Sequence, residues 1–365
     1  MKMMTPDQVH QAADFFVREI KKLTVRPLRL MEVCGTHTVA IFKAGIRQLL
    51  PEMVELVSGP GCPVCVTPNS YLDTAIAYSR NRDVIITTFG DMLRVPGSFS
   101  SLMAAKTDGA DIRIVYSPLD SLEIAKANTG KKVIFLAVGF ETTAPTAAAT
   151  ILAAEQAKLS NFFVLSAHKL VPPALKALLA APQMKVDGFL LPGHVSAIIG
   201  LEPYGFLCHD YKVPAVVAGF EPLDILQSVY MLLKQLADGK ALIENQYSRI
   251  VPQDGNQAAR QVLERVYLPA DAEWRGLGLI EGSGLRLKDT YTAYDALANI
   301  PVDDVVSKDH QGCRCGEVLC GIIKPVACPL FGKTCRPEHP VGACMVSVEG
   351  TCAAWHKYGA GRWQI

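Results

Sequence analysis

The sequence lacks the features that mark membrane proteins, secreted proteins and nucleic-acid-binding proteins. No apolar run reaches the roughly 18 residues needed to cross a bilayer, and the charged, amphipathic N-terminus has no apolar signal-peptide core. Lys and Arg (36) nearly balance Asp and Glu (35), and no basic cluster is interleaved with aromatic residues. We therefore expect a soluble, cytoplasmic protein that spans no membrane and binds no nucleic acid.

Cysteine, by contrast, is plentiful. The chain has 11 cysteines in 365 residues, and half of its residues are hydrophobic. A chain of this length and composition can bury the cores of two or three domains. Because no signal peptide is evident, the cysteines favour metal binding and thiol chemistry over a secreted disulfide framework.

Short apolar runs alternate with helix-like segments along the first two thirds of the chain. The expected strands are 28–33, 54–57, 84–88, 112–116, 133–138, 162–165, 188–191 and 215–217, and the main helices 6–22, 39–50, 71–78, 146–158, 173–179 and 223–236. This alternation is typical of parallel sheets covered by helices. We predict an α/β protein with two similar parallel-sheet units that face a cleft, residues 1–120 and 121–237, with a boundary near Asp120.

Polar side chains that can do chemistry follow the ends of these strands. In open parallel sheets, ligands bind at the carboxyl ends of the strands, where loops and helix N-termini converge. Any one histidine here can equally be a capping or hydrogen-bonding residue, so the shared location is the stronger argument. It predicts one cleft lined by Cys34, His37, Cys62, Cys65, Glu141, His168 and His194.

The loop Gly59-Pro60-Gly61-Cys62-Pro63-Val64-Cys65 places two thiols between a strand end and a helix start. Backbone N–H groups and the positive end of a helix dipole favour thiolate at such a place, which lowers a thiol pKa. The pair can therefore cycle between dithiol and disulfide. Half of a zinc site, or two unremarkable thiols, is the alternative interpretation.

The remainder of the chain, 238–365, has two parts. Up to about Pro301 it is polar and reads as mostly helical, with a helix over 257–266 and no recognisable motif. After that it is loop-rich, because several prolines and glycines interrupt any helix. This tail holds seven cysteines, Cys313, Cys315, Cys320, Cys328, Cys335, Cys344 and Cys352. We expect a bound metal to supply its missing core.

Spacing indicates which metal the tail holds. No pair of Cys-x-x-Cys knuckles is present, which disfavours a zinc ribbon. Cys313, Cys328, Cys335 and Cys352 are separated by gaps of 14, 6 and 16 residues, which suit a four-cornered cluster better than one tetrahedral ion. We therefore expect a C-terminal iron–sulfur domain, with zinc or unmetallated thiols as alternatives. Cys315, Cys320 and Cys344 are surplus, and the isolated Cys208 is expected to be a small buried apolar residue.

Four separate runs carry a resemblance to a known family. They are Glu32-Val33-Cys34-Gly35-Thr36-His37, the Cys-Pro-Val-Cys loop, Gly139-Phe140-Glu141-Thr142-Thr143-Ala144-Pro145 and the spaced cysteines of the tail. The runs occur in the order seen in the HypD family of nickel–iron hydrogenase maturation proteins. The chain resembles this family over nearly its whole length. One departure is Cys320, where this family is expected to have arginine.

The resemblance implies a scaffold on which an iron with two cyanides and one carbon monoxide is assembled as transient cargo. It implies partners, a HypC-type small chaperone and a HypE-type cyanide donor, that serve the hydrogenase large subunit indirectly. It also implies a 4Fe-4S cluster in the tail. Soft thiolate suits low-spin iron, so we expect Cys34 to hold it and His37 to orient or shield it. Cys62 and Cys65 would supply or store two electrons.

Two other functions stay open at this point. One is a thiol-disulfide oxidoreductase acting on a small molecule or a protein disulfide, and the other is a zinc-stabilised interaction module. Cys34 discriminates between a scaffold and an oxidoreductase, because a disulfide reductase needs only Cys62 and Cys65. A scaffold needs a third, non-pairing thiol beside them.

Overall fold

A computed structural model describes residues 5–182, 184–303 and 305–359. Its first helix, α1 (Pro6–Leu23), begins as the sequence predicts. Thr5 is the N-cap, Pro6 occupies the first turn, and the side chains of Thr5 and Gln8 each accept a hydrogen bond from the other's backbone N–H. This capping box satisfies two of the free N–H groups at the start of the helix.

Nine strands form two separate parallel sheets in the described part of the chain. Sheet A has the order β2-β1-β7-β8-β9, and sheet B has the order β4-β3-β5-β6. Sheet A comprises β1 (Leu28–Glu32), β2 (Val54–Ser58), β7 (Gly188–Pro192), β8 (Ala215–Ala218) and β9 (Ile243–Asn245). Sheet B comprises β3 (Val84–Thr88), β4 (Ile112–Ile114), β5 (Lys132–Ala137) and β6 (Phe162–Ser166). The expected α/β class with two parallel-sheet units is confirmed.

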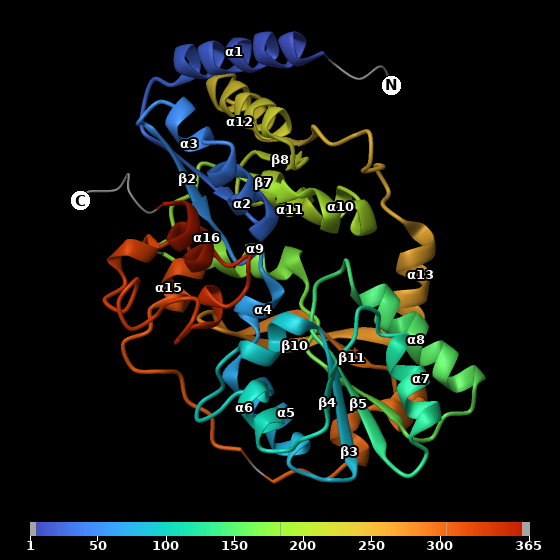
Figure 1. The fold of residues 1–365 in the computed structure, drawn as a ribbon. Coiled ribbons are helices and arrows are strands. Elements are labelled where there is room, and N and C mark those ends of the chain that lie inside the picture. Colours follow the sequence, from blue (N-terminus) through green and yellow to red (C-terminus); the bar gives the residue numbers. More distant parts are fainter. Residues whose placement is uncertain (1–4, 183, 304, 360–365) are drawn as a thin grey trace.

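The two sheets do not follow the expected boundary near Asp120. Strands from both sides of that residue share each sheet, since β1 pairs with β7 in sheet A and β3 pairs with β5 in sheet B. The chain therefore begins sheet A, builds all of sheet B between residues 84 and 166, and then returns to sheet A. Figure 1 shows sheet A in the upper half of the molecule and sheet B in the lower half.

Helices cover both faces of each sheet, and the apolar side chains divide into four clusters accordingly. Between α1 and the tail, the longer helices of the described residues are α2 (Gly35–Lys43), α5 (Asn69–Ser79), α7 (Asp120–Ala127), α8 (Ala144–Gln156), α9 (Val171–Ala180), α12 (Pro222–Ala237) and α13 (Gln257–Val266). The shorter ones are α3 (Ile46–Leu49), α4 (Pro63–Val66), α6 (Leu102–Thr107), α10 (Gly193–Ile199), α11 (Gly205–His209) and α14 (Ala296–Asn299). Among the four clusters, the one that unites α1, α12 and a face of sheet A lies at the top of Figure 1.

One expectation for the segment before Pro301 is wrong. Besides the predicted helix α13, this segment forms an antiparallel hairpin of β10 (Tyr267–Trp274) and β11 (Gly278–Leu287). The side chains of β10 alternate between partly buried and exposed, but the partly buried positions in its middle are Ala270 and Ala272. The apolar alternation that indicates a strand is therefore weak in this sequence.

The cysteine-rich tail has little regular structure, as expected. Its elements are α15 (Cys315–Leu319), two single 3-10 turns, η4 (Pro325–Ala327) and η5 (Ala343–Met345), and a final helix α16 (Thr351–Tyr358). The tail packs on the sheet A unit, where the Trp355 ring of α16 meets the Phe42 ring of α2 edge to face at 5.3 Å. In Figure 1 it is the red segment beside α2 and β2.

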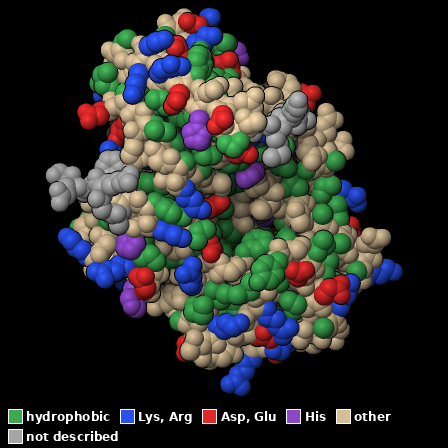
Figure 2. All heavy atoms as spheres, turned by 45° about the horizontal axis from the view of Figure 1, so that its top comes forward, with side chains coloured by type: hydrophobic (Ala, Val, Ile, Leu, Met, Phe, Trp, Pro, Cys, Tyr) green, Lys and Arg blue, Asp and Glu red, His purple; other side chains and the backbone are tan. Residues whose placement is uncertain are grey.

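In the described segments, no helix is both long and apolar enough to span a bilayer. Figure 2 shows one face of the molecule hollowed near its middle, with hydrophobic side chains around the hollow.

Candidate functional site

Cys34 and the Cys-Pro-Val-Cys loop lie together at the carboxyl edge of sheet A. Cys34 follows β1 and is the N-cap of α2, and the loop follows the neighbouring strand β2. The Gly35 N–H donates to the Gly61 carbonyl at 3.1 Å, which ties the two loops together. A Cβ on Gly61 would lie only 2.4 Å from the Cys34 backbone nitrogen, so only glycine permits this approach.

Cys62 and Cys65 form a disulfide, with Cα atoms 5.2 Å apart. Cys62 is the N-cap of α4, and its sulfur accepts from the Cys65 backbone N–H at 3.3 Å. Both residues are buried, with 3% and 0% of their surface exposed. The predicted redox pair is therefore in its oxidised, disulfide form, and it lies in a closed apolar environment.

Cys34 is a free, partly buried cysteine beside this disulfide. Burial raises the pKa of the Cys34 thiol to about 11, and the Glu349 carboxylate adds to the shift. The hydroxyl of Thr36 and the backbone N–H groups of Thr36 and His37 act in the opposite direction and do not outweigh them. The free protein therefore carries a neutral thiol here, and a metal that binds must displace its proton.

His37 and His194 both stack on one aromatic ring. Phe220, which follows β8, lies 4.7 Å from the His37 ring and 4.0 Å from the His194 ring, centroid to centroid. The His37 Nε2 lies 3.2 and 3.0 Å from the carbonyls of Ala218 and Gly219, so we assign the ring proton to that nitrogen. Burial lowers the pKa of His37 to about 4. His37 is thus a neutral, fixed donor to the backbone.

Glu349 reaches the Cys34 region from the cysteine-rich tail. Its Oε1 accepts from the Thr36 hydroxyl at 2.7 Å. Its backbone carbonyl lies where a side chain on Gly35 would stand, 2.3 Å from that Cβ. The tail therefore closes directly over the first turn of α2, next to the predicted iron-binding thiol.

Glu141 follows β5 and is buried near Tyr204. The Glu141 Oε1 accepts from the Val171 N–H at the start of α9 at 2.9 Å, and Oε2 has no hydrogen-bond partner among the described residues. Burial raises the pKa of Glu141 to about 7. The Tyr204 hydroxyl lies within electrostatic reach of both Glu141 and Cys34, which connects this carboxyl to the thiol site.

His168 lies in different surroundings from these residues. Its ring is buried against Tyr267 at 6.0 Å, and it lines a cavity bounded by the β10–β11 hairpin that also contains Lys169. Burial lowers the pKa of His168 to about 3, so the imidazole is neutral. Cys34 is not among the residues that line this cavity.

Six of the seven tail cysteines line one common cavity. They are the four expected cluster ligands Cys313, Cys328, Cys335 and Cys352, together with Cys315 and Cys344. The other lining residues are apolar apart from Gly342, where a Cβ would lie 2.8 Å from the Cys313 sulfur. Contact with the Cys315 thiol, and then burial, raises the pKa of Cys313 well above its usual range. Cys320 lies outside this cavity with its sulfur 4.0 Å from the Gly276 carbonyl.

These thiols suit a soft metal centre. In the part of the chain that the structure describes, no three His, Cys, Asp or Glu side chains already stand in the geometry of a single-ion site. The apolar walls and the six thiols suit a soft metal ion or an iron–sulfur cluster. The lone Cys208 is buried and donates to the Val213 carbonyl at 3.5 Å, as expected of a small core residue.

Comparison with known proteins decides the family. Residues 11–359 match the family model described as "HypD: Hydrogenase formation hypA family". The chain is 49% identical to the hydrogenase maturation factor HypD of Escherichia coli (strain K12) over 358 residues, which are 97% of this chain and 96% of that protein. The chain belongs to the HypD family. Identity is 50% over 342 residues to HypD of Rhodobacter capsulatus (92% and 91% covered), and 45% over 348 residues to HypD of Rhizobium leguminosarum bv. viciae (93% and 90%).

The HypD family match covers both thiol sites and places the chain among hydrogenase maturation factors. Three side chains of the Cys34 site were not predicted, namely Phe220, Tyr204 and Glu349. Phe220 follows a strand end, but the rule that found His194 selects polar side chains and so passes over it. Nothing in the sequence marks Glu349, because its role depends on how the tail packs on α2.

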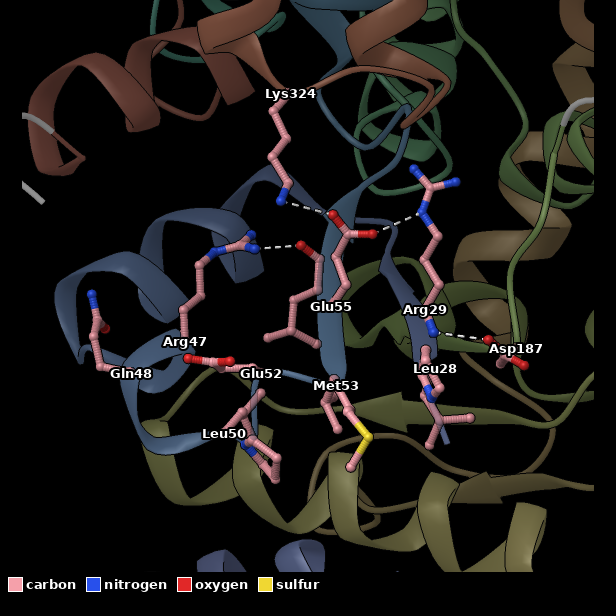
Figure 3. Close-up of a pocket in the computed structure, with 14 residues that line it drawn as sticks. Leu28, Arg29, Arg47, Gln48, Leu50, Glu52, Met53, Glu55, Asp187 and Lys324 are labelled. Carbon is pink, nitrogen blue, oxygen red and sulfur yellow. Dashed lines mark hydrogen bonds and ion pairs between the residues drawn. The ribbon is translucent and has the colours of Figure 1, made fainter. Parts of the chain in front are cut away.

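A wide groove elsewhere in this HypD-family chain is not part of either thiol site. It lies along β2 and α3 and includes Leu28 and Met53 at the amino ends of the first two strands. Its charged side chains are neutralised locally, since Glu55 pairs with Arg29 at 3.2 Å and with Lys324 at 2.9 Å (Figure 3). The size of a groove alone therefore does not identify the functional site of this protein.

Proposed function

We propose that the chain is the scaffold on which the iron of nickel–iron hydrogenase receives two cyanides and one carbon monoxide. Membership of the HypD family supports hydrogenase maturation as the process. The arrangement of the thiols supports the scaffold role. Within that process the partners would be a HypC-type small chaperone and a HypE-type cyanide donor, and the product would pass to the hydrogenase large subunit.

One observation carries the proposal, which is a third thiol beside the disulfide. Cys34 is free, and its loop is bonded to the loop that contains Cys62 and Cys65. An enzyme that only exchanges disulfides needs the pair alone. A free thiol next to the pair provides a ligand that stays available in either redox state of the pair.

Cys34 would bind the iron, because soft thiolate is a good ligand for low-spin iron. The backbone N–H groups of Thr36 and His37 lie toward its sulfur at the start of α2, which suits a negatively charged iron–cyanide unit. Burial keeps His37 neutral and its bonds to backbone carbonyls fix the ring, so it would shape the wall of the site rather than deliver a proton.

Cys62 and Cys65 would exchange two electrons. As two thiols they close to a disulfide with release of two electrons and two protons, and the reverse step takes up the same number. Their burial disfavours attack by a large protein disulfide and supports a partner that reaches the pair inside the molecule. This observation ranks a protein-disulfide oxidoreductase below the scaffold.

A 4Fe-4S cluster would be held by Cys313, Cys328, Cys335 and Cys352 and would supply one-electron transfer. The chain connects that cavity to the disulfide by direct packing. Helix α4, which carries Cys65, contacts η5, which carries Cys344 in the cavity wall. One continuous apolar cluster contains Cys62, Cys65, Cys344 and Cys352, so water is excluded between the two thiol groups.

Replacement of Cys34 by serine tests the proposal. A hydroxyl keeps the size of the side chain but is a poor ligand for soft iron. We expect Cys34→Ser to fold, to keep its tail metal, and to lose the cyanide and carbon monoxide infrared bands of the complex with the small chaperone. Cys208→Ser, at a buried cysteine outside the site, is the control and should keep the bands. Retained bands in Cys34→Ser would assign the iron to other ligands.

A further inference from the structure

The cavity that His168 and Lys169 line is used by neither thiol site. It lies at the carboxyl end of β6, between the start of α5 and the β10–β11 hairpin, and no cysteine is among the described residues of its wall. In parallel sheets, ligands bind at the carboxyl ends of the strands. The volume of about 370 Å³ falls within the usual range of small-molecule sites, roughly 300 to 1,000 Å³.

Lys169 places an unpartnered amine at this cavity. The residue is only 4% exposed, and its backbone N–H donates to the Gly139 carbonyl at 2.9 Å, which fixes the start of the side chain. Its Nζ makes no hydrogen bond or ion pair with any described residue, yet it keeps accessible surface and so opens into the cavity. An ammonium without an acceptor in so buried a place is costly, and a ligand that engages it would recover part of that cost.

The charges of the cavity wall disfavour an anionic ligand. The cations of the wall are Lys169 and Arg286, and the carboxylates are Asp271, Glu273 and Asp295. Of these carboxylates, Glu273 is within electrostatic reach of Lys169. The rest of the wall is largely apolar, with Leu165, Leu285 and Leu287 among its buried residues. The wall therefore suits a small neutral molecule.

Lys169 is partly a free amine at neutral pH. Burial lowers the pKa of Lys169 to about 8, although the Glu273 carboxylate acts in the opposite direction. About a tenth of the molecules then carry the neutral amine at pH 7, against about one in 2,500 for a lysine with the ordinary pKa of about 10.4. The neutral amine is the form of lysine that attacks carbonyl carbon.

We propose that Lys169 forms an imine with a small neutral aldehyde or ketone that enters this cavity. The amine nitrogen would bond to the carbonyl carbon, and the carbonyl oxygen would leave as water with the two amine hydrogens, so no electron is transferred. A proton from solvent would then give an iminium ion, whose positive charge replaces that of the ammonium near Glu273. The carboxylates of the wall favour this cationic product over an amide, which carries no charge.

Reductive trapping on the purified full-length protein tests the inference. The chain is incubated at pH 7 with propanal and cyanoborohydride, and peptide mass spectrometry follows the modification of each lysine. Lys169 should be propylated at least tenfold faster than Lys22, whose side chain is 70% exposed. The rate at Lys169 should saturate as the propanal concentration rises, whereas the rate at Lys22 should rise in proportion. Saturation distinguishes a binding cavity from an amine that is merely reactive.

Glyoxylate, an aldehyde that carries a carboxylate, is the matched control. Relative to Lys22, its trapping at Lys169 should be at least tenfold slower than that of propanal, because the wall carboxylates oppose its charge. Three results would overturn the inference: a Lys169 that reacts no faster than Lys22, a rate without saturation, or a preference for glyoxylate. All three are measured on the original chain, so the test does not depend on whether a Lys169 variant folds.

Discussion

The two groups of cysteines are held by opposite means. Cys34, Cys62 and Cys65 stand at the ends of buried parallel strands, and their loops are fixed by a backbone hydrogen bond and by contacts that only glycine permits. The tail cysteines lie in a segment whose longest element is an eight-residue helix. The strands and loops that position the first group form without any ligand. The core of the tail, in contrast, consists mostly of the cysteine thiols themselves.

This difference predicts which group needs a metal to fold. The packed apolar core around sheet A fixes the position of Cys34 independently of thiol chemistry. A loop-rich segment buries too little apolar surface for that, and a bound metal or cluster then contributes folding free energy directly. Variants of the two groups of cysteines and of the sheet-based frame test this contrast, and the largest effect is expected in the tail.

Cys335→Ala should unfold the tail while sheets A and B stay folded. Loss of one cluster ligand would remove the metal and with it several kcal/mol of tail stability. Cys344→Ala is the matched control, because it deletes a thiol of the same cavity that is not an expected ligand and should cost only about 1 kcal/mol. Iron and sulfide content, together with limited proteolysis, would measure both effects. Loss of sulfide in Cys344→Ala, or zinc in place of iron and sulfide, would contradict this ligand set.

Much of the frame could be predicted from the sequence, because its signals are local. The capping box at Thr5 and the helix over Gln257–Val266 depend on neighbouring residues alone. The same holds for the position of Cys34 and Cys62 after strand ends. Strands β3, β5, β7 and β8 are buried almost throughout, which indicates a buried parallel strand but not its neighbour in the sheet. The return of the chain from sheet B to sheet A therefore could not be read from the pattern.

The details of the site were less predictable, since they depend on contacts between distant segments. Glu349 reaches Thr36 across more than 300 positions of sequence. The cysteine count predicted a metal-binding tail, but spacing did not show that Cys315 and Cys344 share the cavity with the expected ligands. Burial decided the protonation state of Cys34, against the effect of the helix start that the sequence does reveal.

Glu141 should make the stability of the sheet-based frame depend on pH. Its pKa is raised by burial to about 7 in the folded protein, above its ordinary value of 4.5, so the folded state binds the proton more tightly. This contribution is fully present below about pH 4.5 and is lost as pH rises through 7. Relative to the original chain, Glu141→Gln should gain about 2 to 3 kcal/mol of unfolding free energy between pH 5 and pH 8. Denaturant titrations at both pH values would measure it.

Glu123→Gln is the control for that experiment, because Glu123 is an exposed residue paired with Lys126 on the surface. Its unfolding free energy should follow that of the original chain at both pH values. If Glu141→Gln also follows the original chain, Glu141 does not titrate in this range.

Gly61→Ala should disturb the Cys34 site through the backbone. The added Cβ would meet the Cys34 nitrogen and Cα at 2.4 and 2.5 Å, and neither atom can move without shifting the strand end. We expect a loss of about 3 kcal/mol, at the upper end of the usual cost of overpacking. Gly130→Ala is the matched control, since a Cβ there meets no atom within 4 Å. Thermal unfolding compares the two, and equal melting temperatures would show that the loops of the two sheet A strands can separate.

Replacement of both Cys62 and Cys65 by serine should have the smallest effect on folding. The disulfide closes a very short loop, so it removes little entropy from the unfolded chain and contributes only about 2 kcal/mol. The double variant should therefore keep both sheets and its tail metal, and fail only in maturation activity. Thiol-trapping mass spectrometry of the original chain should find the pair as dithiol under reducing conditions and as disulfide under oxidising ones, while Cys208 stays a thiol in both. A pair that never changes state would leave Cys62 and Cys65 as structural residues or metal ligands, and would remove the redox half of the contrast between the two groups of cysteines.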